Sequence, residues 1–310
     1  MPRFSVIIPV YNKEKYLSKT IESVLQQSFI DFEIIIINDG ATDSSEKIIE
    51  GFKDPRIQYI KQENQGVSAA RNAGINAANA NYIALLDADD IWKENYLEQI
   101  NTLIEGYPKQ HVFAAVCAIE SRGSIYNPSY SLAKLSPNKS YVVSYFTASY
   151  INTILTSSST VLHKSVFQTI GYYNTMLRSG EDTDLWIRVG LDYKVVFLNT
   201  PLATYRFEAS SLSNAPKQVK KALDLDCYEK HIASHKGLKK FLDLNRYSLA
   251  LHAKIAGNKR DYVKYKKGID FKNINKKQRF LVSLPRLVLM GLRAAKGVLE
   301  KIGLQLSTYK

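Results

Sequence analysis

Cysteine is scarce in this chain, which argues against a disulfide-stabilised fold and against a zinc-stabilised one. Cys117 and Cys227 are the only two among 310 residues, they form no CxxC pair, and neither has a histidine at metal-binding spacing. A disulfide framework and a structural zinc site therefore both lack their ligands. With 45% hydrophobic residues the chain can still bury a large core, and a reducing cytosolic setting fits best.

Long apolar runs and glycine-rich phosphate loops are also absent from the sequence. No stretch of 18 uncharged apolar residues occurs, and the apolar run in MPRFSVIIPVYN is too short for a signal peptide. We therefore expect a soluble or peripheral protein. Neither GxxxxGKS, GxxxxGKT nor GxGxxG occurs, so a bound nucleotide would be held without a P-loop or a dinucleotide fingerprint.

Acidic residues become rare in the last hundred positions. Residues 1–210 carry 19 Lys and Arg against 22 Asp and Glu, a balance of −3, whereas residues 211–310 carry 23 against 7, a balance of +16. A concentrated basic segment commonly meets an anionic surface, and both nucleic acid and membrane lipid are candidates.

The first hundred residues alternate buried-type apolar runs with amphipathic segments. The runs are FSVIIPV, EIIIIN, IQYIKQ and YIALLD, and helical patterns lie between them. This alternation predicts an α/β fold with a doubly wound, mostly parallel, Rossmann-like sheet. Residues 121–140, rich in Ser, Pro, Asn and Tyr, predict a long loop, and 140–150 and 181–191 predict helices. Strand-like KVVFL and LATYRF follow, and beyond Pro216 the chain is Lys-rich and helical.

Three carboxylates close the stretch YIALLDADDIW, residues 82–92. Asp87, Asp89 and Asp90 place like charges together, which is unfavourable unless a cation or a buried donor compensates them. A divalent cation such as magnesium or manganese suits such oxygens, although one of the acids could simply cap a helix near Trp92. Ligands of doubly wound sheets bind beyond the carboxyl ends of the strands, and Asp39 also falls there.

Each further candidate also has a structural interpretation. Asp39 precedes Gly40, and Asp-Gly is a common turn pair. Arg71, in NQGVSAARNAG, can approach an anion or can be a solvated helix charge. Glu181 and Asp182 follow Gly180, where acids complement a helix dipole, although one of them could reach the strand ends and act as a general base.

Taken in order, these segments resemble the motifs of inverting glycosyltransferase family 2. The segments are FSVIIPVYNKEKYLSKTIESVLQQSFIDFEIIIINDGATDSS, ENQGVSAARNAGI, YIALLDADD, GEDTDLWIR and YRFEASSLS. The resemblance covers residues 4 to about 213. It implies a glycosyltransferase A fold and the inverting transfer of a sugar from a nucleotide diphosphate donor, such as a UDP-sugar, to an acceptor hydroxyl.

The resemblance also implies a role for each matching residue. The nucleoside pocket would be lined by Pro9, Tyr11 and Asn12, and Asp39 would bind the base. Arg71 would lie near the diphosphate, and Asp87 with its neighbour Ala88 would approach the ribose. Asp89 would ligate manganese or magnesium, and Asp182 would be the catalytic base. Many relatives have a His shortly after the YR pair, where this chain has Glu208, which makes Glu208 a further candidate metal ligand. The processive members' QxxRW motif is absent, which favours one sugar per encounter.

The basic tail predicts a second region. We expect a catalytic domain at residues 1–213, with a nucleotide-sugar half to about 120 and an acceptor half after it, and a basic helical region at 214–310. A wheel of about 100° per residue predicts an amphipathic helix over about 286–304. One face carries Leu287, Val288, Leu292, Ala295, Val298, Leu299 and Ile302, and the other carries Arg286, Arg293, Lys296 and Lys301.

That helix fits either packing onto the catalytic domain or lying in an anionic membrane interface. The Lys-rich stretch 259–279 could bind nucleic acid or be a solvated face, but a lipid-linked or glycan acceptor at the inner leaflet is the simpler partner. We expect a cytoplasmic, peripheral enzyme making a surface polysaccharide or lipid-linked glycan. The alternatives are a nucleotidyltransferase, which would need a glycine-rich basic loop that PVYNKEKYL lacks, and a non-catalytic membrane- or RNA-binding scaffold.

Overall fold

The computed structural model describes residues 1–121, 123–206, 223–301 and 308, and the chain divides into two compact units. The first unit contains Met1–Tyr145 and Thr153–Leu223, and the second contains Phe146–Asn152 and Asp224–Lys310. The domain boundary expected between residues 213 and 214 lies outside the described residues.

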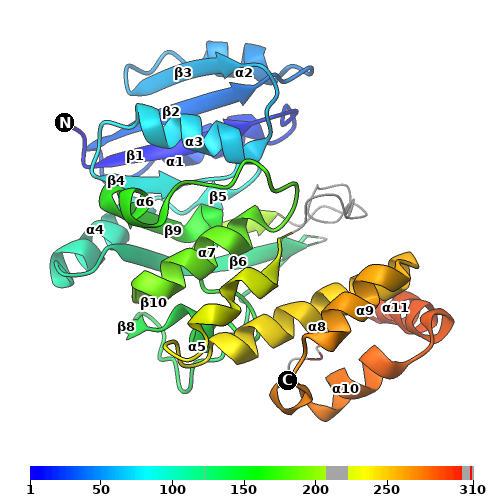
Figure 1. Ribbon diagram of the computed structural model, residues 1–310. Coiled ribbons are helices and arrows are strands. Elements are labelled where there is room, and N and C mark those ends of the chain that lie inside the picture. The colour runs from blue at the N-terminus through cyan, green and yellow to red at the C-terminus, as the bar shows by residue number, and fades with distance from the viewer. Residues whose placement is uncertain (122, 207–222, 302–307, 309–310) are drawn as a thin grey trace. The chain divides into compact units, whose positions relative to one another are not determined.

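A ten-stranded sheet organises the first unit (Figure 1). Its order is β3-β2-β1-β4-β9-β6-β10-β5, with β7 on β6 and β8 on β10. The first four strands are parallel to one another. Beyond them the sheet is mixed, because β9 runs antiparallel to both of its neighbours, while β10 runs parallel to β6. The strands are β1 (Phe4–Val10), β2 (Phe32–Asp39), β3 (Ile57–Gln62), β4 (Tyr82–Leu85), β5 (Ile91–Trp92), β6 (Val112–Ser121), β7 (Ser124–Tyr126), β8 (Ser140–Val143), β9 (Thr160–His163) and β10 (Val195–Arg206).

Helices connect and cover these strands. Because Gly74 on α3 has no side chain, the helix packs closely on the sheet: a Cβ there would lie 2.4 Å from Ile7 Cγ2 and 2.7 Å from Ile37 Cδ1. Figure 1 shows α3 lying across β1 and β2. The helices up to residue 192 are α1 (Leu17–Leu25), α2 (Ser45–Gly51), α3 (Val67–Ala77), α4 (Tyr96–Gly106), α5 (Tyr145–Ala148), η1 (Ser157–Ser159), α6 (Lys164–Ile170) and α7 (Glu181–Asp192).

The predicted α/β fold is confirmed, and one local prediction is wrong. Residues 140–150 form the strand β8 and the single turn α5 instead of one helix. The reason is pairing: Ser140–Val143 runs antiparallel to β10, so its backbone groups are bonded by the sheet. The helix predicted at 181–191 is present as α7.

The second unit is helical. A small apolar core gathers around Leu244, Tyr247, Ile269 and Val282. None of the helices within the described residues is long and apolar enough to span a membrane. The helices of this unit are η2 (Leu225–His231), α8 (Leu238–Ala256), α9 (Lys259–Lys267), η3 (Phe271–Asn273), α10 (Lys276–Ser283) and α11 (Arg286–Lys301).

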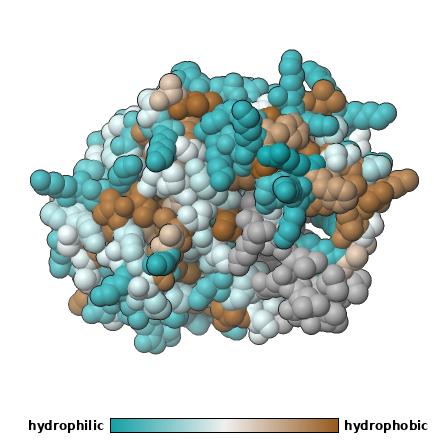
Figure 2. All heavy atoms as spheres, turned by 90° about the horizontal axis from the view of Figure 1, so that it is seen from below, coloured by the Kyte–Doolittle hydropathy of each residue, from teal (hydrophilic) through white to brown (hydrophobic). Residues whose placement is uncertain are grey.

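Apolar surface is visible on the second unit. Figure 2 shows brown surface at the right edge of the view, the side on which α9 to α11 lie in Figure 1. The large apolar side chains exposed on α10 and α11 are Phe280, Leu287, Val288, Met290 and Leu292.

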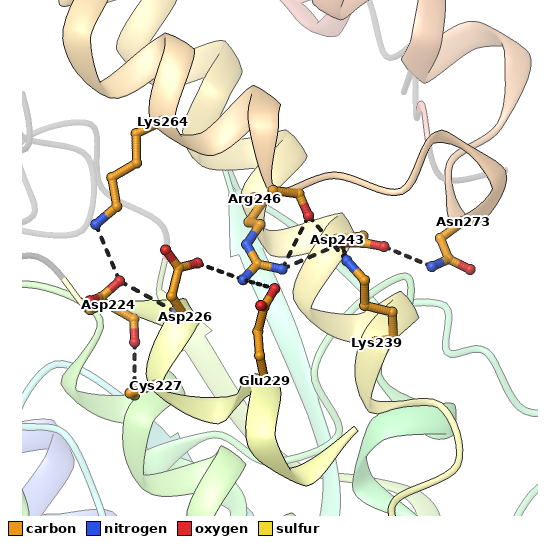
Figure 3. A network of polar contacts seen from close by, with 10 residues as sticks. Asp224, Asp226, Cys227, Glu229, Lys239, Asp243, Arg246, Lys264 and Asn273 are labelled. Atoms are coloured by element: carbon orange, nitrogen blue, oxygen red, sulfur yellow. Dashed lines mark hydrogen bonds and ion pairs between the residues drawn. The ribbon is translucent and has the colours of Figure 1, made fainter. Parts of the chain in front are cut away.

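A buried arginine joins three segments of this unit (Figure 3). Arg246 on α8 donates to Asp226 and Glu229 of η2 at 2.6 and 2.8 Å, and to the carbonyl of Gly268. Its neighbour Asp243 is fully buried and accepts from Arg246, from Lys239 and, at 2.7 Å, from Asn273. Polar groups therefore hold this region together where its apolar core is small.

Candidate active site

The carboxyl ends of β2, β1 and β4 meet at one edge of the sheet. These strands are adjacent and parallel, so the residues that follow them lie side by side. Asp39 is the last residue of β2, Asn12 lies in the loop after β1, and residues 86–90 follow β4. The sequence prediction that these clusters share an edge rested on parallel pairing, which the sheet contains.

The loops after β1 and β2 are tied together by hydrogen bonds, a connection that we term the loop latch. Asn12 adopts a positive φ of 53° and its side-chain oxygen accepts from the Thr42 N–H at 2.8 Å. The Lys13 N–H donates to Ser45 Oγ at 2.9 Å. A left-handed backbone is uncommon outside glycine but is better tolerated by asparagine, so the conformation of Asn12 is set by its partner loop.

Asp39 ties the end of β2 to the loop before α3. One carboxylate oxygen accepts from Gln62 Nε2 at 2.7 Å and the Gln65 N–H at 2.9 Å, and the other accepts from the Gly66 N–H at 2.8 Å. Gly66 has a φ of 91°, which a residue with a Cβ would rarely adopt. Asp39 is thus buried and largely satisfied, whereas Tyr11 is exposed, and Pro9 is buried within β1.

Arg71 joins two carboxylates from distant parts of the chain. Its side chain is only 4% exposed, and its terminal nitrogens donate to Asp87 at 2.7 Å and to Asp182 at 3.0 Å. The guanidinium also lies over the ring of Tyr173, 5.0 Å from the centroid. Burial disfavours its charge, but Asp182 and Asp87 outweigh burial and hold the pKa of Arg71 well above its usual value. The bridge places the first turn of α7 beside the end of β4.

Asp182 has one carboxylate oxygen held and one available. Its Oδ1 accepts from Arg71 and, at 3.0 Å, from Ser157 Oγ, while no described residue donates to Oδ2. The side chain is 40% exposed, so a ligand can reach it. Burial, and next the charge of Asp182, raise the pKa of the neighbouring Glu181 above its usual value. A fixed, accessible carboxylate oxygen of this kind can accept a proton.

Asp89 faces a cation of the protein itself. Its carboxylate forms an ion pair with Lys13 Nζ, from the loop after β1, while Ala88 beside it is buried. Among the described residues, no group of three or more His, Cys, Asp or Glu could hold a metal by itself. Asp89 still fits magnesium or manganese in kind, because these ions are commonly bound by one or two carboxylates together with substrate phosphates.

Asp90, the third acid of the stretch, points into the core. Its carboxylate accepts from Ser158 Oγ at 2.5 Å and from the Arg206 N–H at 3.1 Å, and the residue is 2% exposed. Burial, followed by the charge of Asp87, raises the pKa of Asp90 well above its usual value. Asp90 therefore links the end of β10 to the end of β4. Of the three neighbouring acids, Asp90 is the one with a structural role.

Some contacts of this site were not predicted. Lys13, Ser157 and Tyr173 had no motif to mark them, and only folding brings Ser157 and Tyr173 to Arg71 and Asp182. The basic composition of KEKYL, just after the first strand, is the one signal that points to Lys13. The candidate ligand Glu208 lies outside the described residues.

Known proteins share both the sequence pattern and the fold of this chain. Residues 5–171 match the model of a family described as "Glycosyl transferase family 2". The chain belongs to that family. This family 2 chain is 36% identical over 221 residues to glycosyltransferase GlyA of Streptococcus pneumoniae, which covers 68% of this chain and 31% of GlyA. It is 31% identical to an uncharacterized glycosyltransferase of Rickettsia prowazekii, over 69% of this chain and 66% of that protein.

Solved structures of similar fold come from Staphylococcus aureus. A TarS fragment, residues 1–349, in complex with UDP-GlcNAc superposes with a TM-score of 0.65 at 16% identity, over 95% of this chain and 92% of that one. The same fragment with UDP gives a TM-score of 0.62. These likenesses show the glycosyltransferase A fold. The family 2 chain spans about a third of the length of GlyA.

Proposed function

We propose that this family 2 chain transfers one sugar from a UDP-sugar to an acceptor hydroxyl with inversion. One observation carries the proposal: Arg71 holds Asp182 of α7 next to Asp87 at the end of β4. A base and a donor-binding carboxylate thereby share one site although 95 positions separate them. The complexes of TarS with UDP-GlcNAc and UDP support the choice of donor.

The reaction needs a proton acceptor on one face of the sugar. The acceptor oxygen attacks the anomeric carbon, the bond from that carbon to the diphosphate oxygen breaks, and its electron pair leaves with the diphosphate. Asp182 Oδ2 takes the proton of the acceptor hydroxyl. A single displacement of this kind inverts the anomeric carbon and needs no covalent intermediate.

The donor would occupy the edge formed by β2, β1 and β4. We assign Pro9, Tyr11 and Asn12 to the nucleoside pocket, and Asp39 to the base through the lone pairs that its loop contacts leave. Asp87 and Ala88 would meet the ribose. Arg71 serves the donor indirectly, since both of its terminal nitrogens already hold carboxylates.

We assign a divalent cation, manganese or magnesium, to Asp89. Such an ion neutralises charge that develops on the departing diphosphate. Lys13 occupies the same carboxylate. If Asp89 held such a cation, the Lys13 ammonium would be displaced from this carboxylate and would be free to bind phosphate oxygens. Glu208 remains a further ligand candidate.

For the acceptor, we propose a glycan or a lipid-linked glycan of a surface polysaccharide, met at the inner face of the cell membrane. The basic composition of residues 211–310 supports attachment to an anionic surface. Nucleic acid is the less favoured partner, because a membrane would supply both an anionic surface and the acceptor.

The substitution Asp182→Asn tests the proposed chemistry. We expect turnover of UDP-sugars, followed as UDP release with manganese present, to fall at least about a hundredfold, because the amide cannot accept the proton. Affinity for UDP should stay within about twofold, because no donor contact is removed. Asp192→Asn, an exposed change at the last residue of α7, is the matched control. Unchanged turnover in Asp182→Asn would refute the assignment, and pyrophosphate release from UTP would indicate a nucleotidyltransferase.

A further inference from the structure

Helix α11 is attached to its unit by little of its surface. Of its described side chains, residues 286–296, only Leu289 is buried. Arg286 adds a hydrogen bond from its Nε to the carbonyl of Ile255, 3.0 Å away, at the end of α8. The helix therefore contacts its unit along the side that carries Leu289 and Arg286.

The apolar side of α11 is uncovered. Leu287 is 78% exposed, and Val288, Met290 and Leu292 are also exposed. At 100° per residue, Leu287, Val288 and Leu292 spread over about 140° of the helix surface, and Leu289 borders this face about 60° beyond Leu292. A face with three large aliphatic side chains is normally buried when a helix packs in a water-soluble protein. Here the sequence supplies such a face and the fold leaves it in solvent.

The charged residues around the apolar face of α11 indicate which kind of partner it can bind. From residue 271 to the end of α11 at residue 301 the chain has eight Lys and Arg against one acid, Glu300. Arg279, Arg293 and Lys296 are exposed, as is Phe280 on the preceding helix. Apolar side chains bordered mainly by basic ones suit the interface of an anionic bilayer, where aliphatic groups enter the acyl boundary and cations remain at the headgroups.

We propose that α11 lies in the interface of an anionic membrane, with Leu287, Val288 and Leu292 inserted and Arg293 and Lys296 at the headgroups. The proposal deepens the membrane attachment suggested above by naming the surface, and it does not depend on sugar transfer. A second copy of the chain fits less well, because two such faces would bring like charges together. RNA would use the cations but leave the aliphatic face exposed.

Flotation of the full chain with vesicles tests the surface. Wild-type protein should float with vesicles of phosphatidylglycerol and phosphatidylcholine in equal parts and should not float with phosphatidylcholine alone. The double change Leu287→Ser and Leu292→Ser should lower the bound fraction at least about tenfold, because the inserted groups are lost. Arg293→Ala should lower it about fivefold, and this effect should shrink at high salt.

Two controls make the outcome decisive. Ile30→Ser removes an equally exposed aliphatic side chain, 76% exposed, from the first unit and should float as wild type does. In the variant Leu292→Trp, the fluorescence emission of the new tryptophan should shift to the blue on anionic vesicles. The buried Trp92 and Trp186 supply a background signal that vesicles should not change. Failure of the wild type to float, or flotation of the double variant like the wild type, would overturn the proposal. A dimer that the double variant abolishes, without flotation, would overturn it in favour of a contact between copies. UDP binding, measured in parallel, reports on the catalytic proposal separately.

Discussion

The two units each bury one arginine among carboxylates, and the two sites differ in what they leave open. Arg71 and Arg246 are 4% and 1% exposed at the side chain. Arg71 reaches partners 16 and 111 positions away, and both are partly open to solvent. Arg246 reaches partners within 22 positions, among them a backbone carbonyl and the fully buried Asp243.

The two arginine sites differ in which group the contacts hold in place. At Arg246 the carboxylates, the Gly268 carbonyl and Lys239 close a network around the guanidinium (Figure 3). At Arg71 the guanidinium is the buried end, and Asp182 keeps an oxygen to which no described residue donates. Arg246 therefore holds together parts of a fold, whereas Arg71 fixes two acids that are partly open to solvent.

The largest expected effect is on activity, from Arg71→Met. Without the guanidinium, Asp87 and Asp182 repel each other and the base loses its position, so we expect turnover to fall about a thousandfold. Because water can solvate both partly exposed acids, the free energy of unfolding should fall only about 1 kcal/mol. UDP release and a urea melt measure the two quantities. Arg56→Met, which breaks an ion pair with Asp54 in the same unit, is the control and should leave turnover unchanged.

Arg246→Met should show the opposite profile. The change leaves Asp243 buried with less compensation, so we expect the free energy of unfolding to fall about 3 kcal/mol. Turnover per folded molecule should be unchanged at low temperature. Urea unfolding followed by circular dichroism measures the loss, and the exposed Arg260→Met on α9 serves as control. If Arg246→Met lost turnover while keeping its stability, the division between the two arginines would be wrong.

Ser157→Ala tests a second contact that positions Asp182 at the Arg71 site. It removes one of the two donors to Asp182 Oδ1 and leaves Arg71 in place. A hydrogen bond to a charged group contributes about 1.5–3 kcal/mol, so we expect turnover to fall about ten- to a hundredfold. Ser157→Thr keeps the hydroxyl and should recover most of the rate. Equal losses in both variants would mean that packing, and not the hydrogen bond, matters at this position.

Asp90 extends the comparison to a buried carboxylate without an arginine. The folded state raises its pKa, so it binds a proton more tightly than the unfolded chain does. Its contribution to stability is therefore fully present below its unfolded pKa of about 4 and is lost as pH rises toward the folded pKa. The stability of Asp90→Asn relative to wild type should therefore increase as the pH rises from 4 to 7. A constant difference in melting temperature over that range would contradict this account.

Local pattern was sufficient for the strands and their polar ends, but not for contacts between distant segments. Period and composition predicted β1 to β4 and the edge where Asp39 and Asp87 lie, because parallel pairing fixes that edge. Strand β6 was not predicted, and neither were the short antiparallel strands β5 and β7 to β9, whose two to four residues carry no readable period.

The acids of YIALLDADDIW could not be told apart by sequence. Asp87 faces Arg71, Asp89 faces Lys13, and Asp90 turns to Ser158 and the backbone of Arg206. The three acids lie within four positions of one another, so local sequence does not distinguish them. They differ in their partners, which come from other elements of the fold. The uncovered face of α11 was equally out of reach, because an apolar stripe predicts a helix without saying whether another element covers it.

The loop latch limits which loop exchanges this fold can accept. Thr42 and Lys13 donate backbone N–H groups to side chains of the opposite loop. A grafted β1–α1 loop that lacks Asn12 would leave the backbone N–H and the hydroxyl of Thr42 without this partner. Chimeras intended to exchange nucleotide preference should therefore move both loops as one cassette.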